Sequence, residues 1–266
     1  MENKIANTLF IPFAARVFAA DYFPEYFNDK TALQLKNKIP QKFLTISSQY
    51  EMIASAARYY ISDKIIQEFI DKHGKCNIIN LGAGLETVAF RIHNPNAVFY
   101  QIDLPEVIKL REEILPKNSN EIFIAGSILT REWYQQIDSQ KPSLFIANGV
   151  LMYFHENEIF NLIGNLKQYF SKSELIFDAT TRFGIQCANF YVSRFGCEMA
   201  KMYFYIQNLD EFIQKSQTQL LSSQTFFTDA RKMLGHKMNL ITKFNMWLVD
   251  TFHLSNMIHL ALNGTL

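Results

Sequence analysis

The stretch Cys76-Asn-Ile-Ile-Asn-Leu-Gly-Ala-Gly84 determines how the rest of the sequence is interpreted. Its apolar first part has the length of a buried strand, and Gly82 and Gly84 allow a sharp turn or the close approach of a ligand. A second apolar run, residues 97–102, ends about twenty residues later at Asp103, where an acid can bind both hydroxyls of a ribose. Strand, glycine turn, helix, strand and acid together predict a nucleoside-binding unit.

The glycine turn lacks the features that a nucleotide with phosphates requires. A dinucleotide fingerprint has a third glycine three residues after Gly84, where this chain has Thr87. Glu86 stands at the start of the helix, where its carboxylate would compete with a pyrophosphate for the same amides and the same positive helix end. The Walker pattern is also absent. S-adenosylmethionine has a ribose and an adenine but no phosphate, so it fits this turn better than NAD or ATP.

Length and charge limit the class of protein. The chain has 266 residues, of which 48% are hydrophobic, which is ample for a full core. Lysine and arginine number 26 against 25 aspartates and glutamates, a balance that argues against binding nucleic acid by neutralising phosphates. The sequence shows no basic-then-apolar leader and no run of about eighteen apolar residues that could span a bilayer. We therefore expect a small-molecule partner and neither nucleic acid nor a membrane.

The cysteines and histidines do not indicate a metal site. Cys76, Cys187 and Cys197 are widely spaced and include no Cys-x-x-Cys pair. The six histidines show no His-Glu-x-x-His spacing. We interpret the cysteines as reduced core or surface residues of a cytoplasmic protein and expect no metal.

The region before the glycine turn has a helical pattern. Apolar residues recur at helical spacing over 9–17, with Pro12 near the start of that segment, and residues 51–73 form a long amphipathic pattern that ends at Gly74. Arg58 lies among the apolar residues of the second helix. It either lies along the surface with its stem packed or pairs with a carboxylate of a ligand.

Strands and helices alternate through the middle of the chain. This alternation implies a parallel sheet covered on both faces, with the ligand outside the carboxyl ends of the strands. Asp103, Ser127 and Asn148 follow such ends, so three strands contribute polar groups to one crevice. The expected segments are a helix near 87–93, a strand ending at 103, a helix over 104–115, a strand over 121–125, a segment around 131–137, a strand over 143–147, a helix over 156–170 and a strand over 174–179.

The remainder of the chain is less regular. Residues 209–215 have a helical pattern, residues 219–227 a strand pattern, and residues 239–261 are apolar with aromatics. A stripe of aromatic and methionine side chains either belongs to the core or lines an apolar acceptor pocket. The stripe consists of Phe190, Tyr191, Phe195, Met199, Met202, Tyr203 and Phe204.

The chain contains no repeat and no linker of the composition expected at a domain boundary. We therefore expect a single α/β domain over residues 1–266. It divides into a helical cap over 1–74, a cofactor-binding core over 75–182, and substrate-side helices with the last strands over 183–266.

Five motifs occur in a fixed order along the chain. They are Thr8 to Arg16 with Asp29 and Ala32 after it, Ala57 to Asp63, Asn80 to Ile92, Gln101 to Pro105, and Gly149 to Tyr153. Together they resemble the leucine carboxyl methyltransferase family, and more closely its bacterial branch of tetracenomycin-type polyketide O-methyltransferases. The resemblance covers residues 5–180 well and the rest loosely.

The resemblance implies a class I methyltransferase fold, a seven-stranded sheet whose last strand is antiparallel, with S-adenosylmethionine as cofactor. It implies that Arg58 holds the methionine carboxylate, that the two glycines shape the turn beneath the cofactor, and that Asp103 binds the ribose. Ser127 and Ile128 would flank the adenine. The implied cofactor-binding residues are Arg58, Leu81, Gly82, Ala83, Gly84, Asp103, Leu104, Ser127, Ile128, Asn148 and Gly149.

Two of these positions depart from the pattern of the family. The family usually has aspartate where Ser127 stands and glutamate where Asn148 stands, so both replacements remove a negative charge. Serine can still accept a hydrogen bond from the adenine amino group, without the added strength of a charged acceptor. Glu86 in place of the usual aspartate is a milder change.

Tyr153 and Arg16 are the candidates for acting on the acceptor. Tyr153 lies just past the fourth strand and either contacts substrate or cofactor or packs beside the crevice. Arg16 either closes over the site from the cap and pairs with an anionic acceptor, or bridges helices. We interpret His155 as an exposed residue at a helix start. A carboxylate acceptor is ionised near neutral pH and needs no base, whereas a phenol, with a pKa of about 10, would benefit from one.

The sequence therefore predicts an S-adenosylmethionine-dependent O-methyltransferase that methylates a carboxylate or hydroxyl of a small, apolar or aromatic metabolite by in-line displacement. Two alternatives stay open. One is methylation of a protein C-terminal carboxylate. The other is a cofactor-binding sensor or partner subunit that has lost catalysis, which only the charge losses at Ser127 and Asn148 support.

Overall fold

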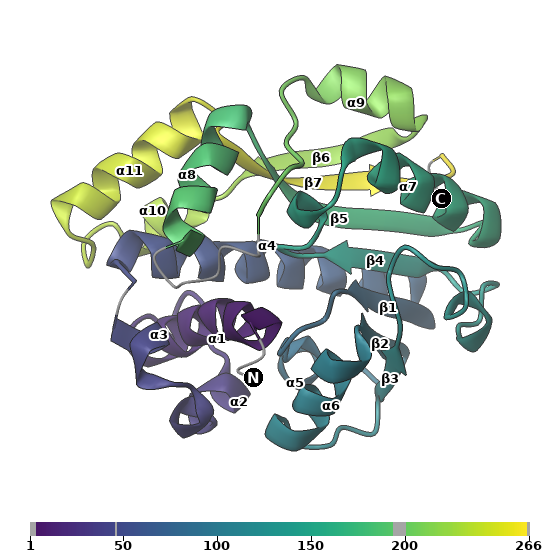
Figure 1. The fold of residues 1–266 in the computed structure, drawn as a ribbon, viewed down its shortest axis with the longest axis horizontal. Coiled ribbons are helices and arrows are strands. Elements are labelled where there is room, and N and C mark those ends of the chain that lie inside the picture. The colour runs from purple at the N-terminus through teal and green to yellow at the C-terminus, as the bar shows by residue number, and fades with distance from the viewer. Residues whose placement is uncertain (1–3, 46, 194–200, 265–266) are drawn as a thin grey trace.

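A seven-stranded sheet forms the centre of the computed structural model, which describes residues 4–45, 47–193 and 201–264 (Figure 1). The strand order is β3-β2-β1-β4-β5-β7-β6, with β1 to β5 parallel and β7 antiparallel to both of its neighbours. The expected class I arrangement, including the antiparallel last strand, is confirmed. The strands are β1 (Cys76–Leu81), β2 (Ala97–Asp103), β3 (Glu121–Ala125), β4 (Ser143–Ala147), β5 (Ser173–Thr180), β6 (Gln219–Thr225) and β7 (Ser255–Ala261).

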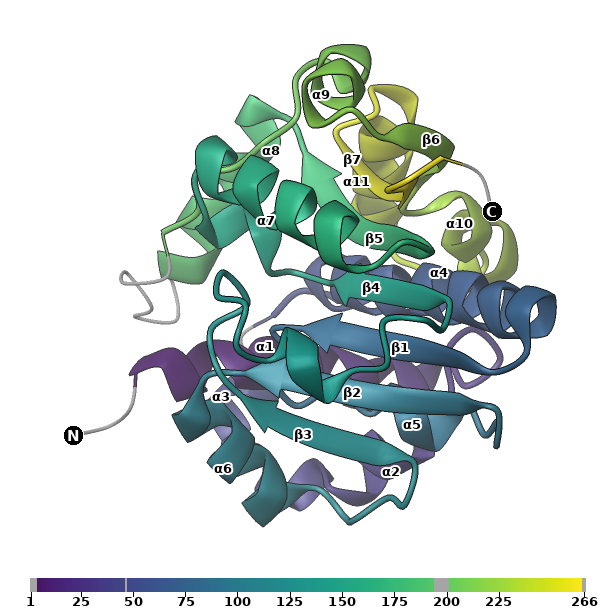
Figure 2. The same cartoon turned by 90° about the vertical axis from the view of Figure 1, so that its right-hand side faces the viewer.

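Helices cover both faces of this sheet (Figure 2). None of the helices in the described ranges is long and apolar enough to cross a membrane. The helices before β1 are α1 (Lys4–Tyr22), α2 (Lys30–Gln34), α3 (Gln41–Thr45) and α4 (Gln49–His73). Those after it are α5 (Val88–Arg91), α6 (Pro105–Ile114), α7 (Glu156–Tyr169), α8 (Arg182–Ser193), α9 (Leu209–Ser216), α10 (Thr228–Leu234) and α11 (Leu240–Thr251). Short 3₁₀ turns are η1 (Lys36–Lys38), η2 (Tyr134–Gln136) and η3 (Leu151–Tyr153).

Strand β1 is buried on both faces, which explains its continuous apolar run. Successive side chains of a strand point to opposite faces. Ile78 joins the core between the sheet and helices α4, α5, α10 and α11, whereas Ile79 joins the core between the sheet and helices α7 and α9. All of β1 is buried, as expected for the middle of a parallel sheet with helices on both sides.

Helix α4 connects the cap to the sheet. It begins with a capping box in which the Ser48 hydroxyl accepts from the Glu51 amide and the Glu51 carboxylate accepts from the Ser48 amide. It ends at Gly74, whose φ of +65° is a conformation that glycine adopts without strain. The helix expected over 51–73 is thus observed and starts slightly earlier.

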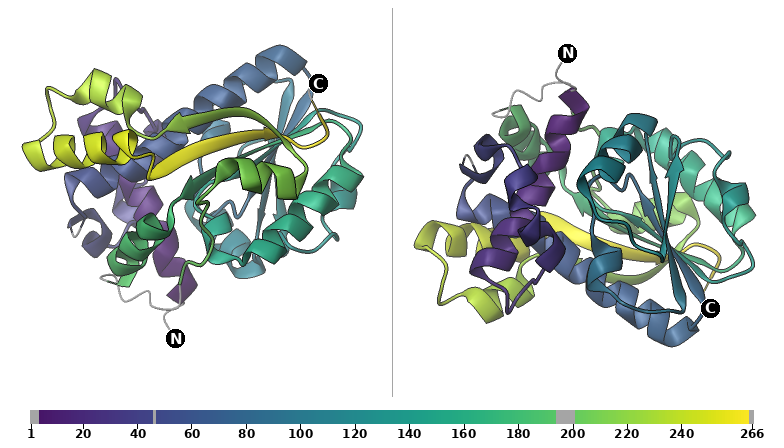
Figure 3. Two further views of the ribbon diagram at one scale, coloured as in Figure 1. Left: turned by 90° about the horizontal axis from the view of Figure 1, so that it is seen from above. Right: turned by 90° about the horizontal axis from the view of Figure 1, so that it is seen from below.

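The cap consists of α1, α2 and α3, which gather with α4 at one end of the sheet (Figure 3). Their apolar side chains form a third core, to which Met202 from the later part of the chain also belongs. Pro12 lies inside α1 and not near the start of the helix, because α1 already begins at Lys4. Proline has no amide hydrogen, so α1 lacks one backbone hydrogen bond there.

Other differences from the expected elements concern length and placement. The helix expected near 87–93 is the four-residue α5, because Ile92 already has an extended backbone with ψ of 97°. Residues 239–261, which had no assigned structure, divide into α11 and β7. Strand β7 lies between β5 and β6, so the last strand in the chain is not the edge of the sheet.

A buried ion network joins the cap to the turn after β1. Its central residue is Asp29, which accepts hydrogen bonds from Arg16 Nε (3.1 Å), Arg91 Nη1 (3.1 Å) and Thr87 Oγ1 (2.5 Å). The same carboxylate caps α2 by accepting from the Ala32 amide at 2.9 Å. One fully buried acid therefore fixes three separate segments.

Two further acids complete the network around Arg91. Asp63 of α4 accepts two hydrogen bonds from this guanidinium, at 2.7 and 2.8 Å, and Glu86 accepts a third at 2.7 Å. Glu86 also lies 3.8 Å from Arg16. Burial alone would raise the pKa of Glu86, but Arg91 and Arg16 outweigh it and lower this pKa to about 2. The acid that follows the glycine turn is therefore a charged partner of the cap.

We expect Asp29→Ala to destabilise the fold by about 3–5 kcal/mol, because it leaves two buried arginines without their shared partner. Urea unfolding monitored by circular dichroism measures this loss. The matched control is Asp21→Ala, which removes an exposed pair with Lys36 at 2.7 Å and should cost less than about 1 kcal/mol. Equal losses in the two variants would contradict the role assigned to Asp29.

Candidate functional site

A cavity of about 960 Å³ lies between the cap and the carboxyl ends of the strands. This volume is near the upper end of the range of about 300–1,000 Å³ for ligand sites, so the cavity has room for more than a nucleoside. It lies at the boundary between β1 and β4, where the strand order reverses, the position at which open α/β sheets bind ligands. All of the site residues named from the sequence line it. They are Arg16, Arg58, Leu81, Gly82, Ala83, Gly84, Asp103, Leu104, Ser127, Ile128, Asn148, Gly149 and Tyr153.

Asp103, at the end of β2, faces the glycine turn. One carboxylate oxygen accepts from the Gly84 amide and the other from the Leu104 amide, each at 2.7 Å. Burial raises the pKa of Asp103, while these two amides act in the opposite direction. A carboxylate oxygen can accept two hydrogen bonds, so both oxygens keep capacity for hydroxyl groups in the cavity.

The glycine turn has no room for side chains. Gly82 and Gly84 have φ of +68° and +48°, and a Cβ on Gly82 would lie 2.6 Å from a methyl group of Val150. The carbonyl of Gly84 accepts from Arg111 Nη1 at 3.0 Å, and Arg111 is itself fully buried and paired with Glu121 at 2.9 Å. This support could not be identified from the sequence, because an arginine in an amphipathic helix gives no sign of the direction in which it points.

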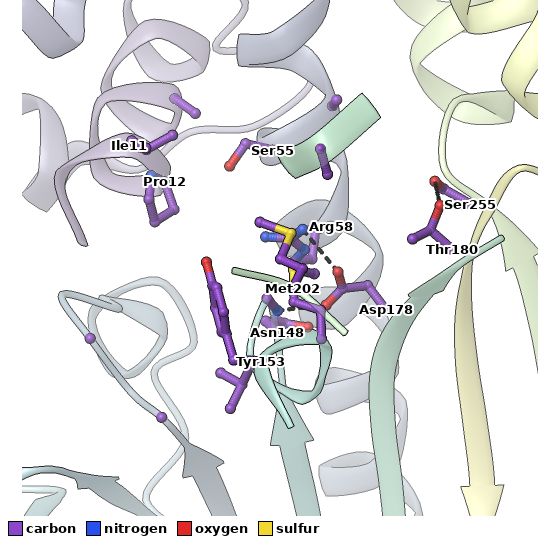
Figure 4. A pocket seen from close by; sticks show the side chains of 18 of the residues that line it. Ile11, Pro12, Ser55, Arg58, Asn148, Tyr153, Asp178, Thr180, Met202 and Ser255 are labelled. Atoms are coloured by element: carbon purple, nitrogen blue, oxygen red, sulfur yellow. Dashed lines mark hydrogen bonds and ion pairs between the residues drawn. The ribbon is translucent and has the colours of Figure 1, made fainter. Parts of the chain in front are cut away.

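Arg58 projects from α4 into the cavity and pairs with Asp178 of β5 (Figure 4). Arg58 Nη2 lies 2.9 Å from the Asp178 carboxylate, whose other oxygen accepts from the Gly149 amide at 2.5 Å. Burial alone would lower the pKa of Arg58, but Asp178 outweighs it and holds this pKa above its ordinary value. The guanidinium is therefore a fixed cation that is only 17% exposed.

Asp178 is a candidate site residue that was not identified from the sequence. The sequence shows Asp178 only as an acid near the end of a largely apolar strand, and the apolar pattern predicts the strand without assigning a role to this acid. Arg58 lines the cavity with a side chain that is 17% exposed, and only Nη2 is paired with Asp178. A guanidinium held in this way can still offer donors to a carboxylate in the cavity.

Gly149 lets the Arg58 guanidinium lie close to the backbone after β4. Its φ is +71°, and a Cβ at this position would lie 2.7 Å from Arg58 Nη1. The neighbouring Asn148 amide contacts the Ser62 hydroxyl at 2.9 Å, and that hydroxyl donates to the Arg58 carbonyl at 2.9 Å. Asn148 thus connects the residues after β4 to α4 by hydrogen bonds. Because its side chain is neutral, it makes this contact without adding a charge near Asp178.

Ser127 lies after β3 in a tight turn. Its hydroxyl accepts from the Leu129 amide at 3.3 Å, and its carbonyl accepts from the Thr130 amide at 3.2 Å. The side chain still has a hydrogen to donate and a second lone pair. Ile128 beside it is buried and Leu104 is partly exposed, so two apolar side chains flank this part of the cavity.

Of the two roles considered for Arg16, pairing with an anionic acceptor and bridging helices, its contacts fit the bridging role. Its side chain is 1% exposed, and it donates to the Asp29 carboxylate and to the Leu85 carbonyl at 2.5 Å. The helical spacing of α1 did not indicate which residue the guanidinium would meet. Because its donors are engaged with the protein, we do not propose Arg16 as an acceptor-binding residue.

Tyr153 lines the cavity from η3, and its hydroxyl points away from the sheet toward α1 and α4 (Figure 4). The preceding Met152 carbonyl accepts from the Tyr203 amide at 2.7 Å, so the segment around Met202 crosses the cavity beside this tyrosine. His155 is exposed at the start of α7, as interpreted from the sequence, with its ring 4.5 Å from that of Tyr203.

The aromatic stripe expected from the sequence divides between the cavity and the core. Phe190, Met202 and Tyr203 line the cavity, whereas Phe204 packs in the core on the α7 and α9 side of the sheet. Phe195, Met199 and the side chain of Tyr191 lie outside the described residues, as does Cys197. Among the residues that are described, no three His, Cys, Asp or Glu side chains form a group that could hold a metal ion.

Comparisons with known proteins agree with this geometry. A sequence profile of the leucine carboxyl methyltransferase family matches residues 2–167. The chain is 25% identical over 164 residues to the tetracenomycin polyketide synthesis O-methyltransferase TcmP of Streptomyces glaucescens, and the alignment covers 61% of this chain and 61% of that protein.

Two solved structures share the fold. One is a DUF574 family protein from Streptomyces avermitilis, with a TM-score of 0.57 and 13% identity over 93% of this chain and 96% of the other. The second is magnesium protoporphyrin IX methyltransferase from Synechocystis PCC 6803 with bound SAH, with a TM-score of 0.50 and 12% identity over 92% of this chain and 98% of the other.

We expect Gly149→Ala to destabilise the protein by about 1–3 kcal/mol, because alanine is strained at this positive φ and its Cβ displaces Arg58. Thermal unfolding measures the loss. The control is Gly164→Ala in α7, where no atom lies within 4 Å of the added Cβ and where we expect a gain of up to about 1 kcal/mol. A neutral Gly149→Ala would show that the close contact between Arg58 and this backbone is not needed.

Proposed function

The chain belongs to the leucine carboxyl methyltransferase family, and on that premise we propose that it is an S-adenosylmethionine-dependent O-methyltransferase for small apolar or aromatic acceptors. One observation carries the proposal. Asp103 ends β2 and Arg58 stands beside the end of β4, so a carboxylate and a guanidinium line one cavity on either side of the glycine turn after β1. A nucleoside with a charged amino-acid end requires these two groups.

The residues of the cavity fit this cofactor. The free acceptor capacity of Asp103 suits the two ribose hydroxyls, and the flank formed by Ser127 and Ile128 suits an adenine. Arg58 suits the carboxylate of the methionine part. Glu86 accepts from the Thr87 amide at 2.7 Å and places a carboxylate in the cavity lining after the glycine turn, which supports a cofactor without phosphates.

Apolar side chains from the cap and from the later part of the chain also line the cavity, and they suit the acceptor. They include Ile11 and Pro12 of α1, Phe183 and Phe190 of α8, and Met202. Bound S-adenosylmethionine supplies a methyl group made electrophilic by a positively charged sulfur. The protein must hold the acceptor oxygen in line with this group and exclude water, and the apolar lining contributes to both.

Tyr153 is the polar side chain that we propose to contact the acceptor oxygen, because its hydroxyl points toward the apolar part of the cavity (Figure 4). A carboxylate acceptor needs no base, so a hydrogen bond that orients it is sufficient. A phenol must lose a proton to a base, and carboxylates that line this cavity are already engaged, Asp178 with Arg58 and Glu86 with Arg91, while Glu51 caps α4. We therefore favour a carboxylate of a small molecule as the acceptor. We place the reaction in the cytoplasm, as the cysteine usage suggests.

We expect the protein to bind S-adenosylhomocysteine in the micromolar range and Asp103→Ala to weaken binding at least tenfold, about 1.4 kcal/mol. Titration calorimetry measures both, with Glu106→Ala, an exposed acid on α6, as the control that keeps wild-type affinity. Transfer of labelled methyl groups to apolar carboxylic acids in preference to phenols and to a leucine-terminated peptide is the expected activity. No binding by folded protein would overturn the proposal, and binding without transfer to any of these acceptors would favour the sensor.

A further inference from the structure

Helix α11 presents an apolar surface that the fold does not use. Leu240, Ile241, Phe244 and Trp247 are 81, 74, 58 and 42% exposed and follow one another on one side of the helix, and we call them the α11 stripe. The opposite side of α11 is buried on α4 and α10. Exposed apolar side chains that gather in this way mark an interaction surface, whereas single ones need no explanation.

The α11 stripe lies beside the apolar part of the cavity. Leu248 and Val249, on the same helix, line the cavity together with Phe183 and Phe190 of α8. These two phenylalanines are 59 and 74% exposed, so the cavity lining reaches the surface on this side. Helices α8 and α11 are both drawn at the end of the molecule where the cap lies (Figures 1 and 3).

The surroundings of the α11 stripe are basic. Residues 228–254 contain four lysines and arginines against two aspartates, and one of the four, Lys237, pairs with Glu25 at 2.5 Å. Both aspartates are paired, Asp229 with Lys64 at 2.7 Å and Asp250, which is buried, with Arg231 at 3.4 Å. Lys232 and Lys243 are exposed, so the surface of α10 and α11 offers positive charge beside the apolar side chains.

We propose that the α11 stripe docks onto the surface of an anionic membrane. A helix with tryptophan, phenylalanine and aliphatic side chains on one side and lysine beside them lies in the interface plane of a bilayer, where apolar burial and attraction to anionic lipid add together. Docking through α11 turns the apolar side of the cavity toward the lipid, from which a lipid-soluble molecule can enter. The docking itself does not depend on methyl transfer.

This proposal departs from the expectation, drawn from the sequence, that no membrane partner exists. That expectation rested on the absence of a spanning run, which surface docking does not require. A second copy of the chain fits the same surface less well. A two-fold interface places the same patch of both copies together, so the exposed Lys232 and Lys243 of one copy would be brought toward those of the other, whereas the nearby acids Asp229 and Glu25 are already paired with Lys64 and Lys237.

Trp247 provides a direct probe of docking, because Trp133, the other tryptophan of the chain, is 1% exposed. Vesicles of phosphatidylcholine with phosphatidylglycerol are titrated into the full-length protein at low salt. We expect a blue shift of the tryptophan emission and co-sedimentation of the protein with the vesicles. Neutral vesicles or high salt should weaken the affinity that both readouts report at least tenfold. Trp247→Phe should abolish the shift and keep most of the co-sedimentation.

Paired variants test which side chains are responsible. Ile241→Glu with Phe244→Glu should reduce vesicle binding at least tenfold with unchanged melting temperature, because both positions are exposed. The control for the two glutamates is Ile122→Glu on β3, at the opposite edge of the sheet, which should leave vesicle binding unchanged. Lys243→Gln should weaken vesicle binding, whereas its control, Lys109→Gln on α6, should not. The proposal would be overturned if the wild-type protein did not bind the vesicles. It would also be overturned if sedimentation velocity showed a dimer that the double variant dissociates, and the α11 stripe would then be assigned to a second copy.

Discussion

The Asp29 carboxylate is the interaction on which the arrangement of the site depends. It sits where the cap meets the sheet, and it binds Arg16 from α1, Arg91 from α5 and Thr87 from the turn after β1. A buried acid is stable only when its charge is compensated, so these three segments must come together for the chain to fold. The cap is therefore held over the strand ends, and the space that remains between them is the cavity.

A second constraint acts inside that cavity. The backbone after β4 has a positive φ at Gly149, which lets Arg58 come close to it, and Asp178 fixes the guanidinium from the other side. The site is therefore formed before any ligand binds, with little reorganisation required of Arg58. Such preorganisation of charged groups in a low-dielectric site is a general source of binding and catalytic strength. Asn148 is neutral, and Asp178 supplies the carboxylate that pairs with Arg58 at 2.9 Å.

Much of the fold, and the gathering of the named site residues around one cavity, could be predicted from the sequence for physical reasons. Strand β1 and its glycine turn impose a local pattern, and a parallel sheet brings Asp103, Ser127 and Asn148 to one edge whatever the loops do. The directions of long charged side chains could not be predicted. Arg16 had two possible roles, and only the packing of α1 against the turn selected the bridging one.

The acceptor side was less predictable because it depends on how distant segments meet. Residues 239–261 are apolar throughout, and no periodicity showed that one side of α11 stays exposed while the other is buried. Phe190 and Phe204 belonged to one stripe in the sequence, yet one lines the cavity and the other packs in the core. Such a division depends on where α8 and residues 201–208 each pack, which local patterns do not encode.

The most direct test of the central claim is a crystal structure of the protein with S-adenosylhomocysteine. The account predicts that the ribose hydroxyls bind Asp103, the amino-acid carboxylate binds Arg58, and the sulfur faces the apolar part of the cavity beside Tyr153. A ligand bound elsewhere, or one that leaves Asp103 and Arg58 without contact, would contradict it.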